Sequence, residues 1–313
     1  MQKHFVLGLT LLISSIPLMA DSVYIDASAP DFSAVYFGTI DLKTGAFHQV
    51  GPNAPPEGLF GLAGGDNGTL IALTYASNLE RFNPATGLTT LIGATGLGDC
   101  ATVTSPCGPT SGNTIGGLGG KIYATDFQNS LYSVNPATGN AALIGSTGIP
   151  GLSFVPGSTN PDGTFNFYDE AIFGHEGKLY ITFDAFVFDP NTGARQSVIT
   201  PESLYEVDPS TAKAILVGPT DPGIGAVANV NGTLYAFNDL DSGIYMLDAG
   251  TGKTTFTGVH FDPAAGVIQG AWAATPEPGS IALVGIGIVL VGRLWRGTRL
   301  RCDGKRASLQ GLD

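Results

Sequence analysis

The sequence predicts an all-β protein, a β-propeller of five four-stranded blades. One observation is a strand–turn–strand pattern, clearest in LYSVNPATGNAALIGSTG at residues 131–148, that recurs along the chain. Another is composition: 45 of 313 residues are glycine and 20 are proline, whereas only 13% are charged. Both residues are costly inside helices and common in turns. The third observation is that the repeat region begins with a unit that lacks one strand and ends with one extra strand, which would complete that unit.

The turn at residues 135–139 is the strongest local signal. Asn135 can bond its own backbone, Pro136 fixes φ at about −65°, and Gly139 accepts the left-handed conformation of a bulged hairpin. The pattern recurs in the same register at residues 37–51, 79–96, 204–220 and 244–258, with Ala212 in place of the glycine in one copy. Five copies of one supersecondary unit indicate a repeat protein.

Each full unit has two further strands before this hairpin. The first is short and rich in small residues, at 59–63, 115–118, 170–173 and 224–228. A glycine turn leads to the second, at 69–73, 121–125, 178–183 and 233–237. Four antiparallel strands in about 40 to 50 residues are typical of a propeller blade. Gly61, Gly117, Ala171 and Ala226 suit a crowded axis.

The first unit is incomplete, with strands only at 23–25, 37–40 and 47–50. Its innermost strand is predicted at residues 268–273, so that both ends of the ring share one blade and no sheet edge is left open at the seam. An open sandwich or a solenoid is the alternative, and it does not explain the matching ends.

The fourth unit carries an insertion. The turns begin at 41, 83, 135, 208 and 248, and the interval of 73 residues is the longest. Residues 188–193 copy the turn, but only 19 residues separate them from the next one, too few for a sixth blade. We interpret them as an extra hairpin.

The N-terminus has the features of a secretory signal peptide. Lys3 precedes an apolar run at 5–13, and small residues lead to Ala20, the expected cleavage site. A buried strand or helix is the alternative. The sequence therefore predicts a signal peptide at 1–20 and an exported propeller at 21–274.

At the other end, Pro276, Glu277 and Pro278 precede an uncharged run at 280–292. The run covers only about 20 Å as a helix, and Leu294 and Trp295 would extend it toward the ~30 Å of a membrane. The cluster Arg293, Arg296, Arg299 and Arg301 is then expected in the cytoplasm, with residues 302–313 as a cytoplasmic tail. A plain C-terminal anchor is the alternative.

This order of Pro-Glu-Pro, transmembrane segment and arginine cluster at 275–301 resembles the PEP-CTERM sorting signal of Gram-negative bacteria. The resemblance implies that exosortase, a membrane-embedded cysteine transpeptidase, recognises and processes the tail. It also implies an inner-membrane precursor and a final place at the cell surface or in an exopolysaccharide matrix. One departure is that residues 302–313 follow the arginine cluster, where the family usually stops sooner.

Charge excludes one class of partner. Residues 21–276 hold 7 Lys and Arg against 23 Asp and Glu, a net charge of 7 − 23 = −16. Because phosphate binding needs a basic surface, nucleic acid is not expected as a partner.

No catalytic set or cofactor motif is found. His175-Glu176 resembles the start of a zinc-protease motif, but position 179 is leucine and the pair lies at a predicted turn. The face opposite the Pro-Thr-Gly turns is expected to collect acidic residues, namely Asp126, Asp184, Asp239 and Asp241. Asp239-x-Asp241-x-Gly243 is a fragment of a calcium loop, although a solvated acidic turn is the commoner case.

Cys100 and Cys107 lie in one predicted loop of an exported protein, so a disulfide is the favoured interpretation and free thiols the alternative. The function expected is non-enzymatic binding at the surface, possible partners being exopolysaccharide or another surface component. The alternative is a propeller lyase or lactonase with a metal at the axis, which would need polar side chains from several blades. The predicted axial strands offer mainly Gly, Ala and Leu, with Glu170 the exception.

Overall fold

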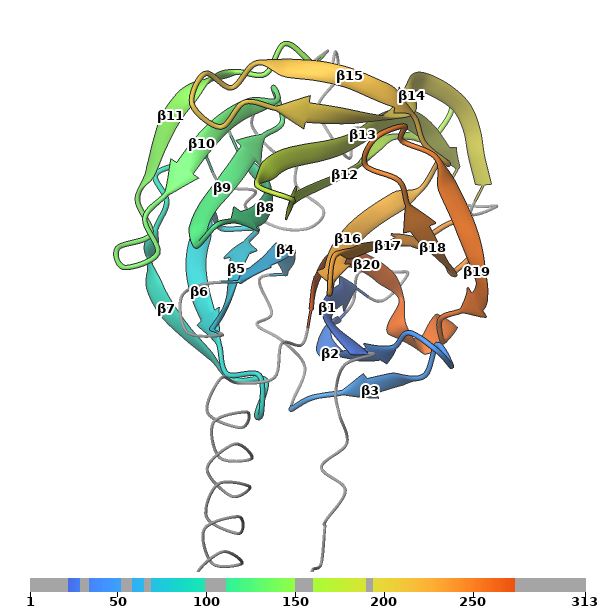
Figure 1. Ribbon diagram of the computed structural model, residues 1–313, viewed down its shortest axis with the longest axis horizontal. Coiled ribbons are helices and arrows are strands. Elements are labelled where there is room, and N and C mark those ends of the chain that lie inside the picture. Colours follow the sequence, from blue (N-terminus) through green and yellow to red (C-terminus); the bar gives the residue numbers. More distant parts are fainter. Residues whose placement is uncertain are drawn as a thin grey trace, which may run out of the picture. The chain divides into compact units, whose positions relative to one another are not determined.

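The computed structural model describes residues 22–28, 34–51, 58–64, 69–98, 111–149, 160–189 and 194–273. Their strands form five antiparallel sheets of four strands each, set around a central axis (Figure 1). The innermost strands, β20, β4, β8, β12 and β16, contact one another in a ring. The predicted five-bladed propeller is therefore confirmed.

The blades are given from the axis outward. The first consists of β20 (Val267–Ala273), β1 (Ser22–Ser28), β2 (Val35–Asp41) and β3 (Phe47–Gln49). The second consists of β4 (Leu59–Gly64), β5 (Leu70–Thr74), β6 (Asn78–Phe82) and β7 (Thr89–Ala94). The third consists of β8 (Gly112–Leu118), β9 (Lys121–Asp126), β10 (Ser130–Val134) and β11 (Ala141–Ser146).

The fourth blade consists of β12 (Phe165–His175), β13 (Lys178–Asp189), β14 (Ala194–Val207) and β15 (Ala214–Pro219). The fifth consists of β16 (Ile224–Val230), β17 (Thr233–Asn238), β18 (Gly243–Leu247) and β19 (Thr254–His260). A 3₁₀-helix, η2 (Pro263–Ala265), connects β19 to the closing strand.

The ring closes as the sequence predicts. β1 pairs with β2 on one side and with β20 on the other, with Val23 opposite Ala273 and Tyr24 opposite Trp272. The first blade thus joins strands from both ends of the repeat region. All described strands and the closing pair lie within one compact unit, residues 21–275, so the propeller is self-contained.

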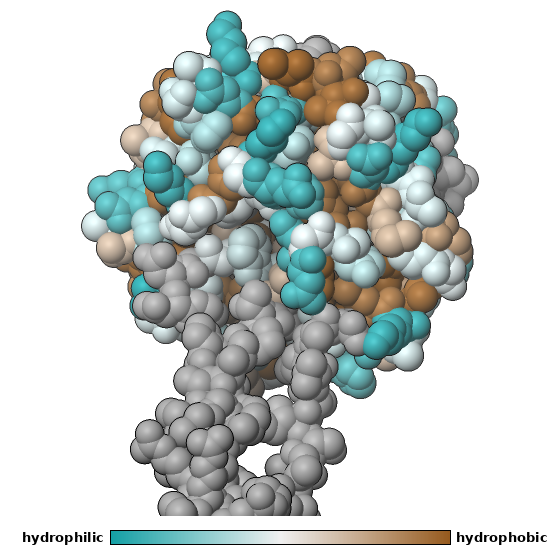
Figure 2. Space-filling model, viewed as in Figure 1, coloured by the Kyte–Doolittle hydropathy of each residue, from teal (hydrophilic) through white to brown (hydrophobic). Residues whose placement is uncertain are grey.

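Among the described residues, five apolar clusters each lie between two neighbouring blades, and a sixth, smaller one joins Tyr75 and Phe127 near the axis. Phe37 of the first blade packs on Phe82 of the second, with ring centroids 4.7 Å apart. Large apolar residues also remain exposed on outer strands, among them Leu91, Leu143 and Leu216. Figure 2 shows hydrophobic residues interspersed with hydrophilic ones around the ring. The blades are therefore held together mainly by packing between sheets.

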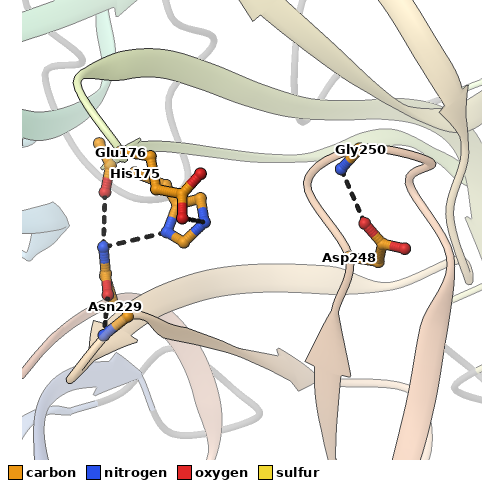
Figure 3. A network of polar contacts seen from close by, with 7 residues as sticks. His175, Glu176, Asn229, Asp248 and Gly250 are labelled. Atoms are coloured by element: carbon orange, nitrogen blue, oxygen red, sulfur yellow. Dashed lines mark hydrogen bonds and ion pairs between the residues drawn. The ribbon is translucent and has the colours of Figure 1, made fainter.

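The repeated turn has the predicted hydrogen bonds. The Asn135 Oδ1 atom accepts from Ala137 N at 2.9 Å, and Gly139, at φ 85°, donates its N–H to Asn135 O at 2.8 Å. Asp248 and Gly250 repeat the side-chain bond at 2.8 Å (Figure 3). Each copy is thus an Asx turn closed by a left-handed residue.

Neighbouring blades also meet at the ends of their outer strands. Ala141 N donates to Thr95 O at 2.9 Å, and Ala214 N donates to Thr147 O at 3.0 Å. A Cβ atom at Gly93 would lie 2.2 Å from Thr138 O of the next blade. The glycine in this outer strand is therefore needed where the following turn approaches.

The insertion in the fourth blade differs from the prediction. β13 and β14 stay paired through Phe186 opposite Val198 and Asp189 opposite Ala194. The copied turn therefore lies at the far end of a lengthened β13–β14 pair, and the expected extra hairpin is not separate. Its tip, residues 190–193, lies outside the described residues.

The described residues contain no helix that is long and apolar enough to cross a membrane. The predicted signal peptide and transmembrane segment lie outside them, as do Cys100, Cys107 and the whole sorting motif from Pro276 to Arg301.

Candidate binding site at the axial mouth

The two ends of the axial strands differ in charge. At the end where these strands begin lie Asp126, Asp169, Glu170, Asp184, Asp239 and Asp241. In or next to the turns at the other strand ends lie Lys43, Lys121, Lys178, Lys213 and Lys253, together with Asp41, Glu176, Asp208 and Asp248. The predicted acidic face is thus confirmed by the strand order. We call its centre, formed by Asp26, Tyr75, Tyr168, Asp169, Glu170, Asp239 and Gln269, the axial mouth.

A polar chain joins the first two blades at the axial mouth. Ser28 Oγ donates to Gln269 Oε1 at 2.9 Å, and Gln269 Nε2 donates to Tyr75 OH at 2.7 Å. Burial raises the pKa of Tyr75, and the nearby charge of Asp26 adds to the rise. These side chains are therefore held in place before any ligand arrives.

Glu170 is the acidic residue that the axial strands were predicted to hold. Its carboxylate accepts hydrogen bonds from Thr125 Oγ1, at 2.6 Å, and from Asn113 Nδ2. Burial raises its pKa to about 8, the charge of Asp126 contributes, and the two hydrogen bonds oppose the rise. Glu170 is therefore protonated at higher pH than an exposed glutamate, and its two hydrogen bonds join the third and fourth blades.

Asp26 is fully buried on β1, and neither carboxylate oxygen has a hydrogen-bond partner in the described part of the chain. Burial raises its pKa to about 7, and the nearby backbone N–H groups of Asp26 and Gly61 oppose the rise. The carboxylate lies over Gly270, where an added Cβ would be 2.2 Å from Oδ1. The small axial residues thus make room for an acid from the second strand.

Asp239 follows β17 and reaches the closing strand. Its Oδ1 accepts from Ile268 N at 2.9 Å, whereas Oδ2 is shielded from solvent and has no partner among the described residues. Burial raises the pKa of Asp239 well above its usual value, and the charge of Asp169 raises it further. Asp169 and Asp239 are therefore close enough to repel each other when both are ionised.

Polar side chains bridge all five junctions between blades at this end. The bridging residues are Gln269 to Tyr75, Ser77 to Gly112, Thr125 to Glu170, Glu202 to Gly223, and Asp239 to Ile268. Three of these junctions use a carboxyl group. The acids therefore have a structural role at the junctions in addition to any role in binding.

Aromatic rings surround part of the same region. Phe60 packs edge-on against Tyr75 at 4.0 Å, and Phe127 packs edge-on against Tyr168 at 5.2 Å. Tyr168 is half-buried. Burial raises the pKa of its phenol well above the usual value, and the charges of Glu170 and Asp169 raise it further. The axial mouth thus combines carboxyl groups with a rigid aromatic cluster.

The two residues of the calcium-loop fragment have different partners. Asp241 accepts from Gly243 N at 2.7 Å and from Tyr245 OH at 2.6 Å, within its own hairpin. Asp239 instead faces the first blade. Among the described residues, no group of three or more His, Cys, Asp or Glu side chains could hold a metal ion.

His175 and Glu176 lie at the turn between β12 and β13, as predicted (Figure 3). Asn229 Nδ2 contacts Gly174 O at 3.2 Å and His175 Nδ1 at 3.3 Å. The histidine therefore belongs to a contact between the fourth and fifth blades.

Five residues of the axial mouth were missed in the sequence: Asp26, Tyr75, Tyr168, Asp169 and Gln269. Asp26 had one usable signal, because it is the only charged residue in the strand SVYIDAS. Of the others, Tyr75 directly follows β5, whereas Tyr168 and Asp169 lie within β12 and Gln269 within β20, none with a spacing that marks it. Only ring closure brings Gln269 next to Tyr75.

The fold and site define a five-bladed propeller with an acidic, aromatic axial mouth. No protein-family model matches the chain, and no curated protein matches it. Similar solved structures include a chain of the nidogen/laminin complex, with a TM-score of 0.43 and 12% identity over 80% of this chain and 97% of that one.

A PQQ-bound aldose sugar dehydrogenase from Streptomyces coelicolor has a TM-score of 0.41 and 15% identity, over 62% of this chain and 60% of that one. The Dos1 propeller has a TM-score of 0.34 and 11% identity, over 75% of this chain and 60% of that one. Similarities this low carry no functional argument.

Proposed function

We propose that this chain is an exported, non-enzymatic binding protein of the cell surface or exopolysaccharide matrix, and that it binds its ligand at the axial mouth. The observation that carries the proposal is convergence. Residues of four blades form the axial mouth, and the third blade reaches it through Asn113 and Thr125, which bond to Glu170. Rigid scaffolds commonly bind ligands where loops and strand ends gather on one face.

The sequence supplies the route to the surface. A signal peptide at 1–20 would export the chain, and the tail at 275–301 would hold it in the inner membrane until exosortase processes it. The arginine cluster favours a cytoplasmic end for that tail. The mature protein would then be released to the surface or matrix.

The use of the polar groups favours binding over catalysis. Glu170 is held by Thr125 and Asn113, and Asp239 by Ile268, so these acids stabilise junctions between blades. No described nucleophile and base form a hydrogen-bonded pair of the kind that catalysis by a serine or cysteine requires. The arrangement thus positions a ligand without an evident reaction.

The test uses purified residues 21–274, the self-contained propeller. We expect the protein to sediment with exopolysaccharide isolated from the producing bacterium, and expect D169N to reduce that binding. Turnover of sugar, lactone or ester substrates by the same preparation would contradict the non-enzymatic proposal.

An enzymatic role is the second candidate, and the acids of the axial mouth favour it. Burial raises the pKa of Asp26 to about 7 and that of Glu170 to about 8. Carboxyl groups with raised pKa values are typical of active sites, although structural networks also contain them. A lyase or lactonase with an axial metal would show turnover that is lost on chelation and restored by the metal.

A further inference from the structure

We propose that the outer strands of the fifth blade carry a second binding surface, on which Tyr245, Phe256 and His260 hold one sugar ring of a neutral, β-linked polysaccharide. We call these three residues the rim cluster. They lie on β18 and β19, at the outside of the ring (Figure 1). The inference goes beyond the proposed function, because it uses no residue of the axial mouth.

Three aromatic rings are in contact in the rim cluster. Tyr245 and Phe256 are cross-strand partners whose ring centroids lie 5.3 Å apart, and the rings of Phe256 and His260 lie 4.9 Å apart. The side chain of Phe256 is nevertheless 42% exposed. Two neighbours therefore hold the Phe256 ring in place, while much of its surface remains open to solvent.

The repeat itself does not require these rings. Leucine occupies the position of Phe256 in the second, third and fourth blades, and serine occupies the position of His260 in the third blade. The leucines are Leu91, Leu143 and Leu216, and the serine is Ser146. Because leucine and serine suffice for the blade, the aromatic rings indicate a role that belongs to the fifth blade.

A bulge in β19 brings His260 to Phe256. Two extra residues, Thr257 and Gly258, interrupt the pairing of β19 with β18, whereas the outer strand of the third blade has only one extra residue, Ile144. Residues four apart in a regular strand are about 13 Å apart, but the rings of Phe256 and His260 are 4.9 Å apart. Bulges commonly re-aim side chains near functional sites. The larger bulge is therefore a second feature of the fifth blade that builds the cluster.

Polar groups border the rings of the rim cluster. Tyr245 OH donates to Asp241 Oδ2 at 2.6 Å, and Thr254 Oγ1 of β19 donates to Asp221 Oδ2. His260 Nδ1 lies 3.0 Å from Asp241 O. A carbonyl oxygen only accepts, so Nδ1 carries a proton and Nε2 of the neutral ring is an acceptor. The imidazole and the two carboxylates can therefore accept hydrogen bonds from sugar hydroxyl groups.

The surroundings favour a sugar over a protein as the partner. Phe256 lies between threonines in the strand sequence TTFTGVH, so its ring is not part of a large apolar patch of the kind that marks protein interfaces. The bulge also makes the edge of β19 unsuitable for pairing with a strand of another chain. A pyranose has an apolar C–H face the size of an aromatic ring and a border of hydroxyl groups. That shape matches an exposed ring bordered by acceptors.

Charge selects among polysaccharides. Asp221 and Asp241 are exposed acidic residues beside the rim cluster. Carboxylates repel anionic polymers, so a polyuronate is disfavoured. A β-linked glucan is neutral, and its equatorial hydroxyl groups leave both faces of each sugar ring free to stack. We therefore expect a neutral β-glucan as the ligand.

The experiment titrates the full chain with cellohexaose, in a detergent without a sugar headgroup, and follows the ligand by saturation-transfer NMR. We expect saturation to reach the C–H protons of one sugar face, because that face lies on the Phe256 ring. F256L should weaken binding about three- to tenfold, since it keeps an apolar side chain but removes the aromatic contact. F256W keeps a ring and should bind like the wild type. L143A removes the exposed leucine at the corresponding position of the third blade and should leave binding unchanged.

Other outcomes overturn the inference. Equal binding by F256L and the wild type, together with a loss in D169N, would contradict it and would support binding at the axial mouth alone. Equal losses in F256L and L143A would indicate non-specific adhesion to exposed apolar residues. Binding of alginate or oligolysine in place of cellohexaose would exclude a neutral sugar as the ligand. Absence of cellohexaose binding would contradict the inference and leave the axial mouth to its own exopolysaccharide test. Circular dichroism of each variant confirms that the propeller is folded.

Discussion

The carboxylate of Asp239 accepts a 2.9 Å hydrogen bond from the backbone N–H of Ile268, which joins the fifth blade to the axial strand of the first. This bond adds a polar contact to the seam that β1 and β20 close by strand pairing. The second oxygen of the same carboxylate has no hydrogen-bond partner among the described residues, and burial, together with the charge of Asp169, raises the pKa of the group. One residue therefore serves both ring closure and the candidate site.

The first prediction separates these two roles. D239A leaves the N–H of Ile268 without an acceptor, which should lower the free energy of unfolding by about 1 to 3 kcal/mol. D239N keeps an oxygen acceptor and should remain closer to the wild type. Urea unfolding at pH 5 measures both variants. Equal stability of D239A and D239N would contradict a structural role for the bond.

Ring closure depends on buried residues of the first strand. Ile25 on β1 has no exposed surface and packs in the cluster between the first and fifth blades. I25A should lower stability by about 2 to 5 kcal/mol, because it removes buried methylene groups and leaves a cavity. L143A, on the outer strand β11 where Leu143 is 64% exposed, serves as the control and should change stability little. Similar losses in both variants would argue against the closed ring.

The architecture could be predicted from the sequence because its signals are local. The Asn135 turn depends on residues that bond within five positions, and its copies give the blade count. The closing strand at 268–273 followed from counting strands in the first unit. The length of β13 and β14 could not be predicted, because strand pairing continues past the copied turn wherever cross-strand partners remain available.

Two glycines with positive φ allow a matched test of close packing between blades. Gly139, at φ 85°, would place a Cβ 2.6 Å from Gly93 O, whereas Gly119, at φ 58°, has open space around it. G119A should cost about 1 to 2 kcal/mol from backbone strain alone. G139A should cost more, because the neighbouring strand must also move. Thermal unfolding of both variants checks the order, and a reversed order would contradict the packing.

Glu170 predicts a dependence of stability on pH. Its pKa rises from 4.5 to about 8 on folding, so the folded state holds its proton more tightly than the unfolded chain. The contribution of Glu170 to the free energy of unfolding is therefore complete below pH 4.5 and is lost as pH rises toward 8. Hydrogen bonds in their turns lower the pKa values of Asp208 and Asp248. The stability that these two groups contribute is therefore lost as pH falls below about 4.

The measurement is urea unfolding of wild type and E170Q at several pH values between 5 and 8. The stability of the wild type should fall with rising pH, and E170Q should show a weaker fall because glutamine does not titrate. An identical pH profile for the two proteins would exclude Glu170 as a source of the dependence. In E170Q, the free energy of unfolding should still fall with rising pH up to about pH 7, because folding raises the pKa of Asp26 to about 7.

Less of the site than of the fold could be predicted. Glu170 and Asp239 stood out as acids at the ends of predicted strands. Tyr75 and Gln269 are 194 residues apart, and their 2.7 Å contact depends on how the ring closes. The burial of Asp26 likewise depends on Gly61 and Gly270, which belong to two other strands. Such contacts have no signature in the spacing of one segment.

The measurement that tests the central proposal most directly is fractionation of the producing bacterium with and without exosortase. The proposal predicts that the protein reaches the surface or matrix fraction with its tail removed, and that loss of exosortase leaves it full-length in the inner membrane. Replacement of Pro276, Glu277 and Pro278 by alanine should have the same effect as that loss. A full-length protein that stays in the cytoplasm in both strains would contradict the account.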